Sequence, residues 1–550
     1  MVGTLHERIE RDGGRRTEGV MPGSGLRGGP FRRAGHVRAV GPAVAGTLVL
    51  LALLGFGPVA PAAPVLADGP WPAQSFPPPP SGGQPSPSPS VMPSVPPSVL
   101  PSIDPSTPPS TDPASPSPSL APAPSGSAAP ASSPSSAPTP RAFPSPSRIP
   151  PITPLPITPG SVTFYGRGYG HGLGLSQYGA RGRALAGQSA ATIVAHYYHG
   201  TAPALVSVTA PIRVLVLGPL APTAAHPLIL HGRGAPFTID GITGTFPIGA
   251  RAEVWRSGNG YAIQVNSATG ALLLTTSSKV ADLRFRSGAE PGRLQLDSKP
   301  SSDDTYRATL RIVATSSGSI VVNEVGLDLY LRGVVPAEMP ATWPAEALKA
   351  QAIAARSYAE AHVHVGVGAY DLFDDTRSQV YHGSLGEVTN GTSAVSATAG
   401  MILKSGSTII TALYHSADGG ATENNENVYT SASGQIVASP LSYLRGSSDR
   451  APSGVSYDST SPHATWQTAT YTWAQLSAIF ATDARTNVGA LTSLDLSAKG
   501  VSGRPIRVTL TGSLGTKTVN TEIFREVFNA GSPAADPYMW STLIDTVPIP

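Results

Sequence analysis

A single glutamate in this sequence has the surroundings expected of an acid/base residue. Glu338 is flanked by Pro336 and Pro340 and by apolar side chains such as Val335 and Met339. Burial beside apolar groups favours the protonated form of a carboxyl, which a general acid needs, whereas a helix N-terminus and nearby cations favour the ionised form. The sequence does not decide that balance, but it makes Glu338 the candidate proton donor.

Two cations follow Glu338 on a stretch rich in alanine. Lys349 and Arg356 are seven residues apart, so on a helix they lie on one face, about 10.5 Å apart along its axis. Such a stripe could hold anionic groups of a substrate. The alternative is that both residues are solvated surface charges. Glu346, in the first turn of the same helix, is explained better by its interaction with the helix N-terminus.

Glycine occupies every second position of residues 166–174. If this segment is extended, one face is bare and the other displays the side chains between the glycines, which are Arg167, Tyr169, His171 and Leu173. A flat ligand could lie on that face, or the glycines could allow another backbone to pack closely. The spacing differs from the G-x-G-x-x-G of dinucleotide-binding proteins, and no carboxylate follows before Asp240.

Composition excludes several classes of function. The chain has no cysteine, which removes thiolate nucleophiles, thiolate zinc sites and disulfides. Its formal net charge is only +3, so no strong field favours nucleic acid and we expect no nucleic-acid partner. His362 and His364 with Asp371 give a weak metallopeptidase alternative, but there is no H-E-x-x-H and histidines two apart on a helix diverge. We interpret them as surface histidines.

The elements that must position these residues are a mixture of strands and helices. Strand-like runs occur at residues 212–217, 271–275, 306–314 and 320–325, without regular alternation with helices. A helix is predicted after Pro344 and through His362, and further helices are predicted at residues 176–186, 189–199 and 473–481. The pattern predicts an α+β fold with a single large domain over residues 160–547, and argues against a doubly wound parallel sheet.

The N-terminal part of the chain is typical of an exported protein. Within residues 1–67, basic residues precede an uncharged apolar run at residues 39–57, and small residues ending at Ala67 suit a signal peptidase. The run is also long enough to span a bilayer, so a membrane anchor is the alternative. Residues 68–159 are Pro, Ser and Ala-rich and are predicted to be a disordered linker. We therefore expect an extracytoplasmic protein, either secreted or membrane-anchored.

Five segments together resemble the SpoIID/LytB family, which includes stage II sporulation protein D and the amidase enhancers. The segments are residues 168–180, 330–358, 374–383, 415–424 and 503–512. The glycine-rich segment comes late in the sporulation proteins but precedes Glu338 here, so the order resembles a permuted subgroup. The resemblance covers most of the chain after residue 160. It implies an exported protein that acts on peptidoglycan and is associated with the cell wall.

The sporulation members of this family are lytic transglycosylases that cleave glycan strands lacking stem peptides. The resemblance implies the same reaction here, with Glu338 as the single general acid/base. Lys349 and Arg356 fall on basic positions of the family and would hold the muramyl lactyl carboxylate. Further substrate-binding residues are expected within the matched segments: His171, Gln177, Gln379, Tyr381 and His415.

The chain departs from its relatives at one position pair, and two other functions stay open. Many relatives carry cysteines at the positions of Phe373 and Ser378 and some bind zinc; this chain has no such pair, so we expect no metal and no cofactor. An ordinary glycoside hydrolase would need a second carboxylate roughly 5 to 9 Å from the first, which Asp374, Asp375 or Asp418 could supply. A binding module that stimulates a separate cell-wall amidase would need no catalytic glutamate.

Overall fold

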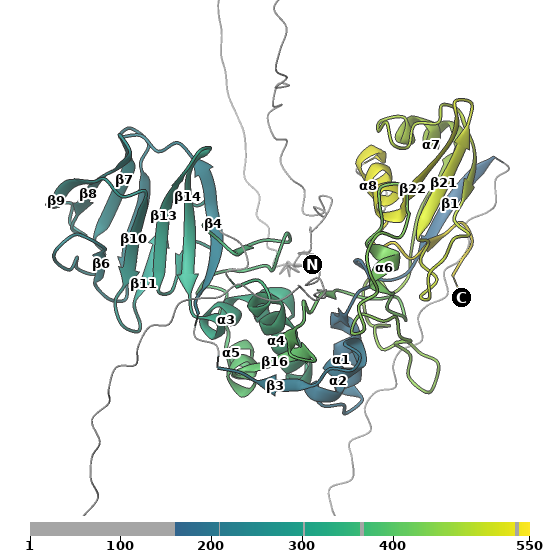
Figure 1. The fold of residues 1–550 in the computed structure, drawn as a ribbon, viewed down its shortest axis with the longest axis horizontal. Coiled ribbons are helices and arrows are strands. Elements are labelled where there is room, and N and C mark those ends of the chain that lie inside the picture. Colours follow the sequence, from purple (N-terminus) through teal and green to yellow (C-terminus); the bar gives the residue numbers. More distant parts are fainter. Residues whose placement is uncertain (1–159, 208–209, 301–302, 364–367, 534–537, 550) are drawn as a thin grey trace, which may run out of the picture. The chain divides into compact units, whose positions relative to one another are not determined.

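The computed structural model describes residues 160–549, apart from 208–209, 301–302, 364–367 and 534–537. The expected export signal (1–67) and linker (68–159) lie outside the described residues, and the single domain over 160–547 stays a prediction. Helices and strands are mixed along the described chain (Figure 1), which confirms the α+β class. Within this part of the chain, no helix is both long and apolar enough to cross a membrane.

Two six-stranded sheets occupy the middle of the chain. The first has the order β15 (Leu372–Phe373), β4 (Ile212–Leu220), β14 (Gly318–Val325), β13 (Thr309–Thr315), β10 (Asp282–Ser287) and β6 (Phe237–Ile239). The second has the order β12 (Thr305–Tyr306), β11 (Arg293–Leu296), β5 (Leu228–Arg233), β7 (Arg251–Ser257), β8 (Gly260–Asn266) and β9 (Leu272–Ser278). Neighbouring strands of both sheets run antiparallel, except that β15 runs parallel to β4.

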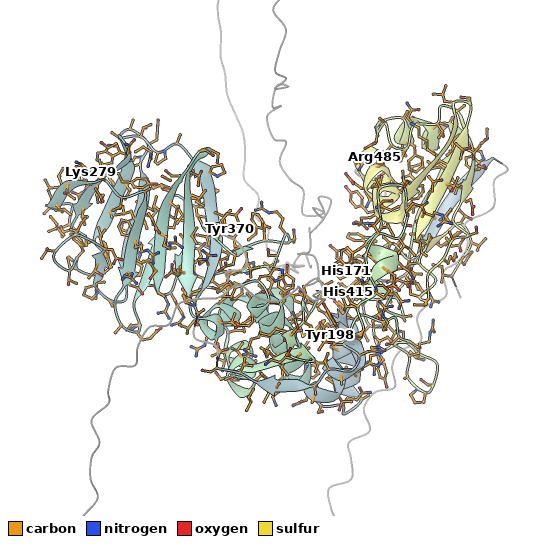
Figure 2. All side chains as sticks on the ribbon, viewed as in Figure 1. His171, Tyr198, Lys279, Tyr370, His415 and Arg485 are labelled. Carbon is orange, nitrogen blue, oxygen red and sulfur yellow. The ribbon has the colours of Figure 1, made fainter. Side chains whose placement is uncertain are left out.

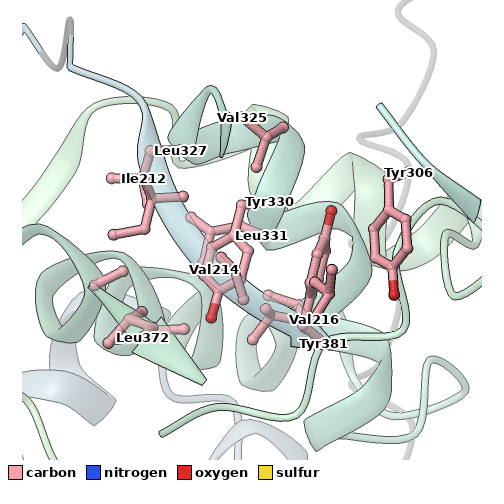
Figure 3. Close-up of a cluster of buried hydrophobic side chains, with 14 of the residues drawn as sticks. Ile212, Val214, Val216, Tyr306, Val325, Leu327, Tyr330, Leu331, Leu372 and Tyr381 are labelled. Carbon is pink, nitrogen blue, oxygen red and sulfur yellow. The ribbon is translucent and has the colours of Figure 1, made fainter. Parts of the chain in front are cut away.

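The first sheet fixes the start of the helix that carries Glu338. Alternate residues of β4 point into the core, so Ile212, Val214 and Val216 are buried and the residues between them are less so. Figure 3 shows these side chains in one cluster with residues of α3 (Leu327–Glu338). Only Gly326 separates β14 from α3. The strand and the helix are therefore anchored in the same core.

Helix α4 (Ala345–Glu360) is buried along most of its length. Its alanines allow close approach by α1 (Gln177–Leu185), α2 (Ala190–Tyr197), α3, α5 (Thr389–Ala397) and β16 (Met401–Ser405). The strand β16 lies between β17 (Thr408–Ile409) and β3 (Pro203–Leu205). This helical layer brings the beginning of the described chain against the segment that follows Glu338.

The C-terminal elements have a hydrophobic core of their own. The strand β1 (Ser161–Gly166) lies between β19 (Trp466–Thr472) and β23 (Ile544–Asp545), and β21 (Arg507–Gly512) lies between β20 (Leu491–Asp495) and β22 (Gly515–Asn520). The helices α7 (Trp473–Phe480) and α8 (Thr521–Gly531) complete the set. Phe164 of β1 contacts Phe524 and Phe528 of α8 edge-on. The first described strand is thus built into a C-terminal sheet.

Most predicted elements are present with slightly shifted ends, but the single strand predicted at residues 306–314 is wrong. The chain breaks after Tyr306, and Ala308 adopts a positive φ of 62°. A residue in that conformation cannot continue an extended strand. The run is consequently divided between β12 and β13, which belong to different sheets.

Glu338 lies ahead of α4, as expected from the sequence, but it is also the last residue of a helix that the sequence did not predict. Pro336 lies inside α3 and cannot donate a backbone hydrogen bond, which is why the residue pattern did not predict a helix here. The helix nevertheless continues to Glu338, and the amide of Met339 closes its last turn on the carbonyl of Val335 at 3.0 Å.

The glycine-rich segment is not an extended strand with a displayed face. Gly168, Gly170, Gly172 and Gly174 all have positive φ, between 66° and 110°. A Cβ on Gly174 would collide with the carbonyl oxygen of Leu413. The alternative interpretation, that the glycines permit close backbone packing, therefore describes this segment.

Candidate functional site

The Glu338 carboxyl group is buried and held by two donors. Its side chain is 2% exposed. The backbone amide of Val380 donates to Oε1 at 2.9 Å, and Nε2 of Gln177 donates to Oε2 at 3.4 Å. Gln177 is the first residue of α1, whose start is fixed because Ser176 accepts a hydrogen bond from the amide of Gly179 at 3.1 Å. Three of the five segments that resemble the SpoIID/LytB family thus meet at one carboxyl group.

Gln379 and Tyr381, on either side of Val380, are fully buried. Gln379 donates to the hydroxyl of Tyr414 at 3.0 Å and accepts from the hydroxyl of Tyr330 at 3.2 Å. Tyr381 donates to Asn323 at 2.9 Å, and Figure 3 shows its ring beside that of Tyr330 in the core. These contacts orient the Val380 amide toward Glu338. The prediction that Gln379 and Tyr381 contact substrate has no support in this geometry, because both side chains are occupied within the core.

His171 and His415 form a pair with ring centroids 5.2 Å apart (Figure 2). His415 belongs to β18 (Tyr414–His415), which runs parallel to β2 (Leu175–Ser176) directly before Gln177. The two imidazoles share one backbone residue: the amide of Leu173 donates to Nδ1 of His171 at 2.9 Å, and Nδ1 of His415 contacts the carbonyl oxygen of Leu173 at 3.1 Å. A carbonyl only accepts, so Nδ1 of His415 carries the hydrogen and Nε2 has a lone pair.

Both histidines are held in the neutral form. Burial lowers the pKa of His171 to about 3, and it lowers the pKa of His415 well below its usual value. Arg504 contributes in the same direction for both. Nε2 of His415 is buried and has no hydrogen-bond partner among the described residues. At neutral pH this atom can accept a hydrogen bond from a hydroxyl group, but the imidazole cannot act as a general acid.

Lys349 and Arg356 do not form an exposed cationic stripe. Arg356 is 0% exposed. Its Nε donates to Asp328 at 2.9 Å, and its terminal nitrogens reach the carbonyl of Val395 at 3.1 Å and Thr398 at 3.3 Å. Lys349 is partly exposed and pairs with Glu346 at 2.8 Å. The predicted role of Arg356 as a substrate clamp is thus unsupported, because its guanidinium group is enclosed by its own protein.

Glu346 does more than interact with the start of its own helix. It also accepts a hydrogen bond from the amide of Ala190, the first residue of α2, at 2.7 Å. Lys349 and this amide lower the pKa of Glu346. The carboxylate therefore links the N-termini of α2 and α4.

An aromatic pair with a cation includes the residue that follows Gln177. Tyr178 follows Gln177 in α1, and its ring meets that of Trp343 edge-on with centroids 4.7 Å apart. The guanidinium group of Arg181 lies over Trp343, 5.5 Å from the ring centroid. All three side chains are partly exposed. This group offers flat apolar surface and a positive charge, which the buried Arg356 does not.

A buried acidic cluster also contacts α1. Asp449 accepts hydrogen bonds from Arg183 of α1 at 2.8 Å and from Tyr197 of α2 at 2.9 Å. Asp418 and Asp458 are also buried, and Oδ2 of Asp418 receives no donor from the described residues. Burial raises the pKa of Asp449 to about 7, against the effect of Arg183. Burial, with Asp449 and Asp458 nearby, raises the pKa of Asp418 well above its usual value.

We expect Asp418→Asn to remove part of the pH dependence of folding. The pKa of Asp418 is higher in the folded than in the unfolded chain, so the folded state binds the proton more tightly and stability falls as pH rises above the unfolded value of 3.8. The Asn side chain can still donate a hydrogen bond toward Asp458, and it has no ionisable proton whose loss would destabilise the folded state. The stability gain of the variant over the parent should therefore be larger at pH 8 than at pH 5.

Urea unfolding of both proteins at the two pH values measures this difference. The buried histidines are present in parent and variant alike, so the comparison reports on the cluster of Asp418, Asp449 and Asp458. Asp495→Asn changes an exposed carboxyl group and serves as the control, for which no gain at high pH is expected. A variant that loses stability equally at both pH values would contradict the assignment of the proton to Asp418.

The three carboxylates considered as partners of Glu338 are engaged elsewhere. Asp374 pairs with Lys299 at 2.5 Å and Asp375 with Arg377 at 2.7 Å, while Asp418 belongs to the acidic cluster. Asp375 also accepts the amide of Arg377 at 3.0 Å, as a turn-capping residue does. No group of three or more potential metal ligands is found among the described residues.

The weak metallopeptidase alternative gains nothing from the structure. His364 lies outside the described residues. Nδ1 of His362 is 2.6 Å from the carbonyl oxygen of Tyr358, and its imidazole lies tilted against the ring of the same tyrosine. Asp371 forms an ion pair with Arg213. His362 and Asp371 therefore have other partners.

The comparison with known families identifies the segment that carries Glu338. Residues 315–404 match the SpoIID family of stage II sporulation proteins. This part of the chain belongs to the SpoIID family. The SpoIID match includes Glu338, Lys349, Arg356, Gln379 and Tyr381 but ends before His415 and begins after Gln177. The geometry above joins Gln177 to Glu338, and it joins Tyr414, the neighbour of His415, to Gln379.

Curated relatives agree with the SpoIID assignment. The amidase enhancer of Bacillus subtilis is 36% identical over 148 residues, which are 26% of this chain and 20% of the relative. Stage II sporulation protein D of the same organism is 34% identical over 187 residues, 31% of this chain and 50% of the relative. An uncharacterized protein of Brachyspira hyodysenteriae is 36% identical over 126 residues, 22% of this chain and 34% of the relative. The chain therefore spans half or less of each relative's length.

Several residues of the site were not singled out from the sequence. Tyr330, Tyr178 and Trp343 lie within or next to the resembling segments, and their aromatic character was the available signal. Arg183 and Asp449 had no such signal, because they are 266 residues apart and only the fold brings them together.

Proposed function

We propose that this protein is an exported peptidoglycan-acting enzyme, a lytic transglycosylase that cleaves peptide-stripped glycan with Glu338 as its single general acid/base. The observation that carries the proposal is the Glu338 carboxyl group, which contacts the Val380 amide and Gln177 but, among the described residues, no other carboxylate. The SpoIID match over this residue supports it. Membership of a family with stage II sporulation proteins also favours a role at the cell wall, outside the cytoplasm.

The proposed reaction needs one proton carrier. Glu338 gives its proton to the glycosidic oxygen as the bond from C1 breaks. The muramyl C6 hydroxyl then attacks C1, and its proton returns to the Glu338 carboxylate, which closes the 1,6-anhydro ring without water. A single residue that alternates between acid and base is sufficient for both transfers. An ordinary hydrolase would need a second carboxylate, and the three candidates are bound to other partners.

The aromatic pair and Arg181 are the proposed means of holding the strand. Tyr178 and Trp343 provide ring faces for a sugar, and Arg181 can bind the lactyl carboxylate that is free once the peptide is removed. His415 is left out of the proposed substrate contacts, because its side chain is buried and its Nε2 is not reached from solvent. The aromatic pair and Arg181 replace the Lys349 and Arg356 stripe in the proposed substrate site.

Digestion of purified peptide-stripped glycan with the full chain tests the reaction class. Mass spectrometry should find 1,6-anhydromuramyl ends, which only the intramolecular reaction produces. Reducing muramyl ends in their place would identify a hydrolase and contradict the single-residue mechanism.

A non-catalytic role as an amidase-stimulating module is the second candidate. The similarity to a protein named amidase enhancer favours it. Under this function the chain would not cleave glycan, and a cell-wall amidase would act faster in its presence. Stimulation that is equal for the parent and for Glu338→Gln would support this candidate.

A further inference from the structure

The C-terminal elements enclose a groove that is separate from the Glu338 site. It has a volume of about 390 Å³ and lies among β1, β19, the start of α7 and β20, within the usual size of small-molecule sites. Tyr165 and Trp473 contribute aromatic surface. Thr163, Thr470, Thr492 and Thr546 contribute hydroxyl groups.

The groove contains no charged side chain. None of its ten lining residues is Asp, Glu, Lys, Arg or His. The charge next to it, on Asp545, is neutralised by an ion pair with Lys499. A ligand with a phosphate, carboxylate or ammonium group would lose its hydration there without gaining a partner of opposite charge. The ligand that fits this lining is consequently an uncharged molecule rich in polar groups.

Hydroxyl groups and aromatic rings together match a saccharide. Each Ser or Thr hydroxyl can both donate and accept, as sugar hydroxyls do. Trp473 packs against the C-terminal core but remains partly exposed, so it can offer its other surface to the apolar face of a sugar ring. The hydroxyls of Thr163 and Thr470 lie 2.8 Å apart across β1 and β19, which fixes two polar atoms on the rigid surface of a sheet.

We propose that this groove binds one uncharged N-acetylglucosamine unit of a glycan strand. The choice of N-acetylglucosamine rests on the proposed function, because such uncharged sugars lie between the muramyl residues of the strand cut at Glu338. The groove lies on β1, which continues into the glycine-rich segment that leads to Gln177. A strand held there would stay attached to the protein between cleavage events at Glu338.

Fluorine NMR can follow ligand binding at the groove and at the Glu338 site separately. The full chain carries Glu338→Gln and is labelled with 5-fluorotryptophan. The chain has six tryptophans, and the variants Trp473→Phe and Trp343→Phe assign the two informative signals. Titration with chitotetraose, a neutral N-acetylglucosamine oligomer, should shift the Trp473 signal saturably. A Trp473 signal that does not move overturns the proposal, whatever Trp343 does. A shift of the Trp473 signal without a shift of the Trp343 signal supports sugar binding in the groove and counts against sugar binding at the Glu338 site.

A pair of threonine variants tests the contacts within the groove. Thr470→Val removes a lining hydroxyl at nearly constant volume and should weaken chitotetraose binding about fivefold, as expected for one hydrogen bond. Thr518→Val is the matched control, because Thr518 and Thr509 form a similar cross-strand pair at 3.1 Å outside the groove. Equal affinity of the two variants would contradict binding through the groove hydroxyls.

Discussion

Glu338→Gln is expected to lower glycan cleavage by about 10² to 10⁴, the usual effect of losing an acid/base group. The amide has the shape of the carboxyl group, and its oxygen can still accept the hydrogen bond from the Val380 amide. It cannot give up or receive the proton that the reaction moves. The release of anhydromuramyl products from peptide-stripped glycan, followed by mass spectrometry over time, measures the loss.

Two controls separate chemistry from folding in this experiment. Glu360→Gln makes the same change at the end of α4, outside the proposed site, and should leave the rate unchanged. The unfolding transition of Glu338→Gln should remain close to that of the parent. If the variant cleaves glycan at the parental rate, Glu338 is a structural residue and the amidase-stimulating function becomes the better explanation.

Arg356→Met is expected to destabilise the protein by about 1 to 3 kcal/mol, because buried acceptors lose the hydrogen bonds that the guanidinium group donates. Methionine fills the same space but donates no hydrogen bond to the carbonyls of Val395 and Met401 or to the hydroxyl of Thr398. Asp328 would also lose its ion-pair partner. Urea unfolding monitored by circular dichroism measures the change.

Lys349→Met is the matched variant on the same helix. Its ammonium group is partly exposed and pairs only with Glu346 among the described residues, so a change within about 0.5 kcal/mol is expected. If Arg356→Met were as stable as the parent and instead bound glycan weakly, the original interpretation of Arg356 as a substrate clamp would be restored.

Local patterns in the sequence were sufficient to predict the helices and strands whose buried residues recur at a regular spacing. The helix α4 was predicted because Pro344 and an alanine-rich run define it, and α7 because its N-cap and apolar face are adjacent in the sequence. The helix α3 was not predicted because Pro336 contradicts the local preference. Packing of Tyr330 and Leu331 against the first sheet overrides that preference.

The sequence motifs predicted where the site is, but they did not predict the role of each residue in it. Glu338 and Gln177 are 161 positions apart and meet as donor and acceptor. Arg356, Gln379 and Tyr381 belong to the same segments but are turned into the core. A residue type and its spacing do not reveal whether a guanidinium or amide group faces a ligand or a backbone carbonyl, because that depends on neighbours contributed by distant parts of the chain.

The position of β1 has a consequence for the order in which the protein can fold. Thr163 of β1 and its partner Thr470 of β19 are 307 residues apart, and the other neighbour, β23, comes later still. During synthesis β1 has no strand partner until nearly all of the chain has been made. Contacts of such long sequence separation slow folding, because a large loop must close before they form. The C-terminal core is therefore expected to be completed last, by capturing the first of the described strands.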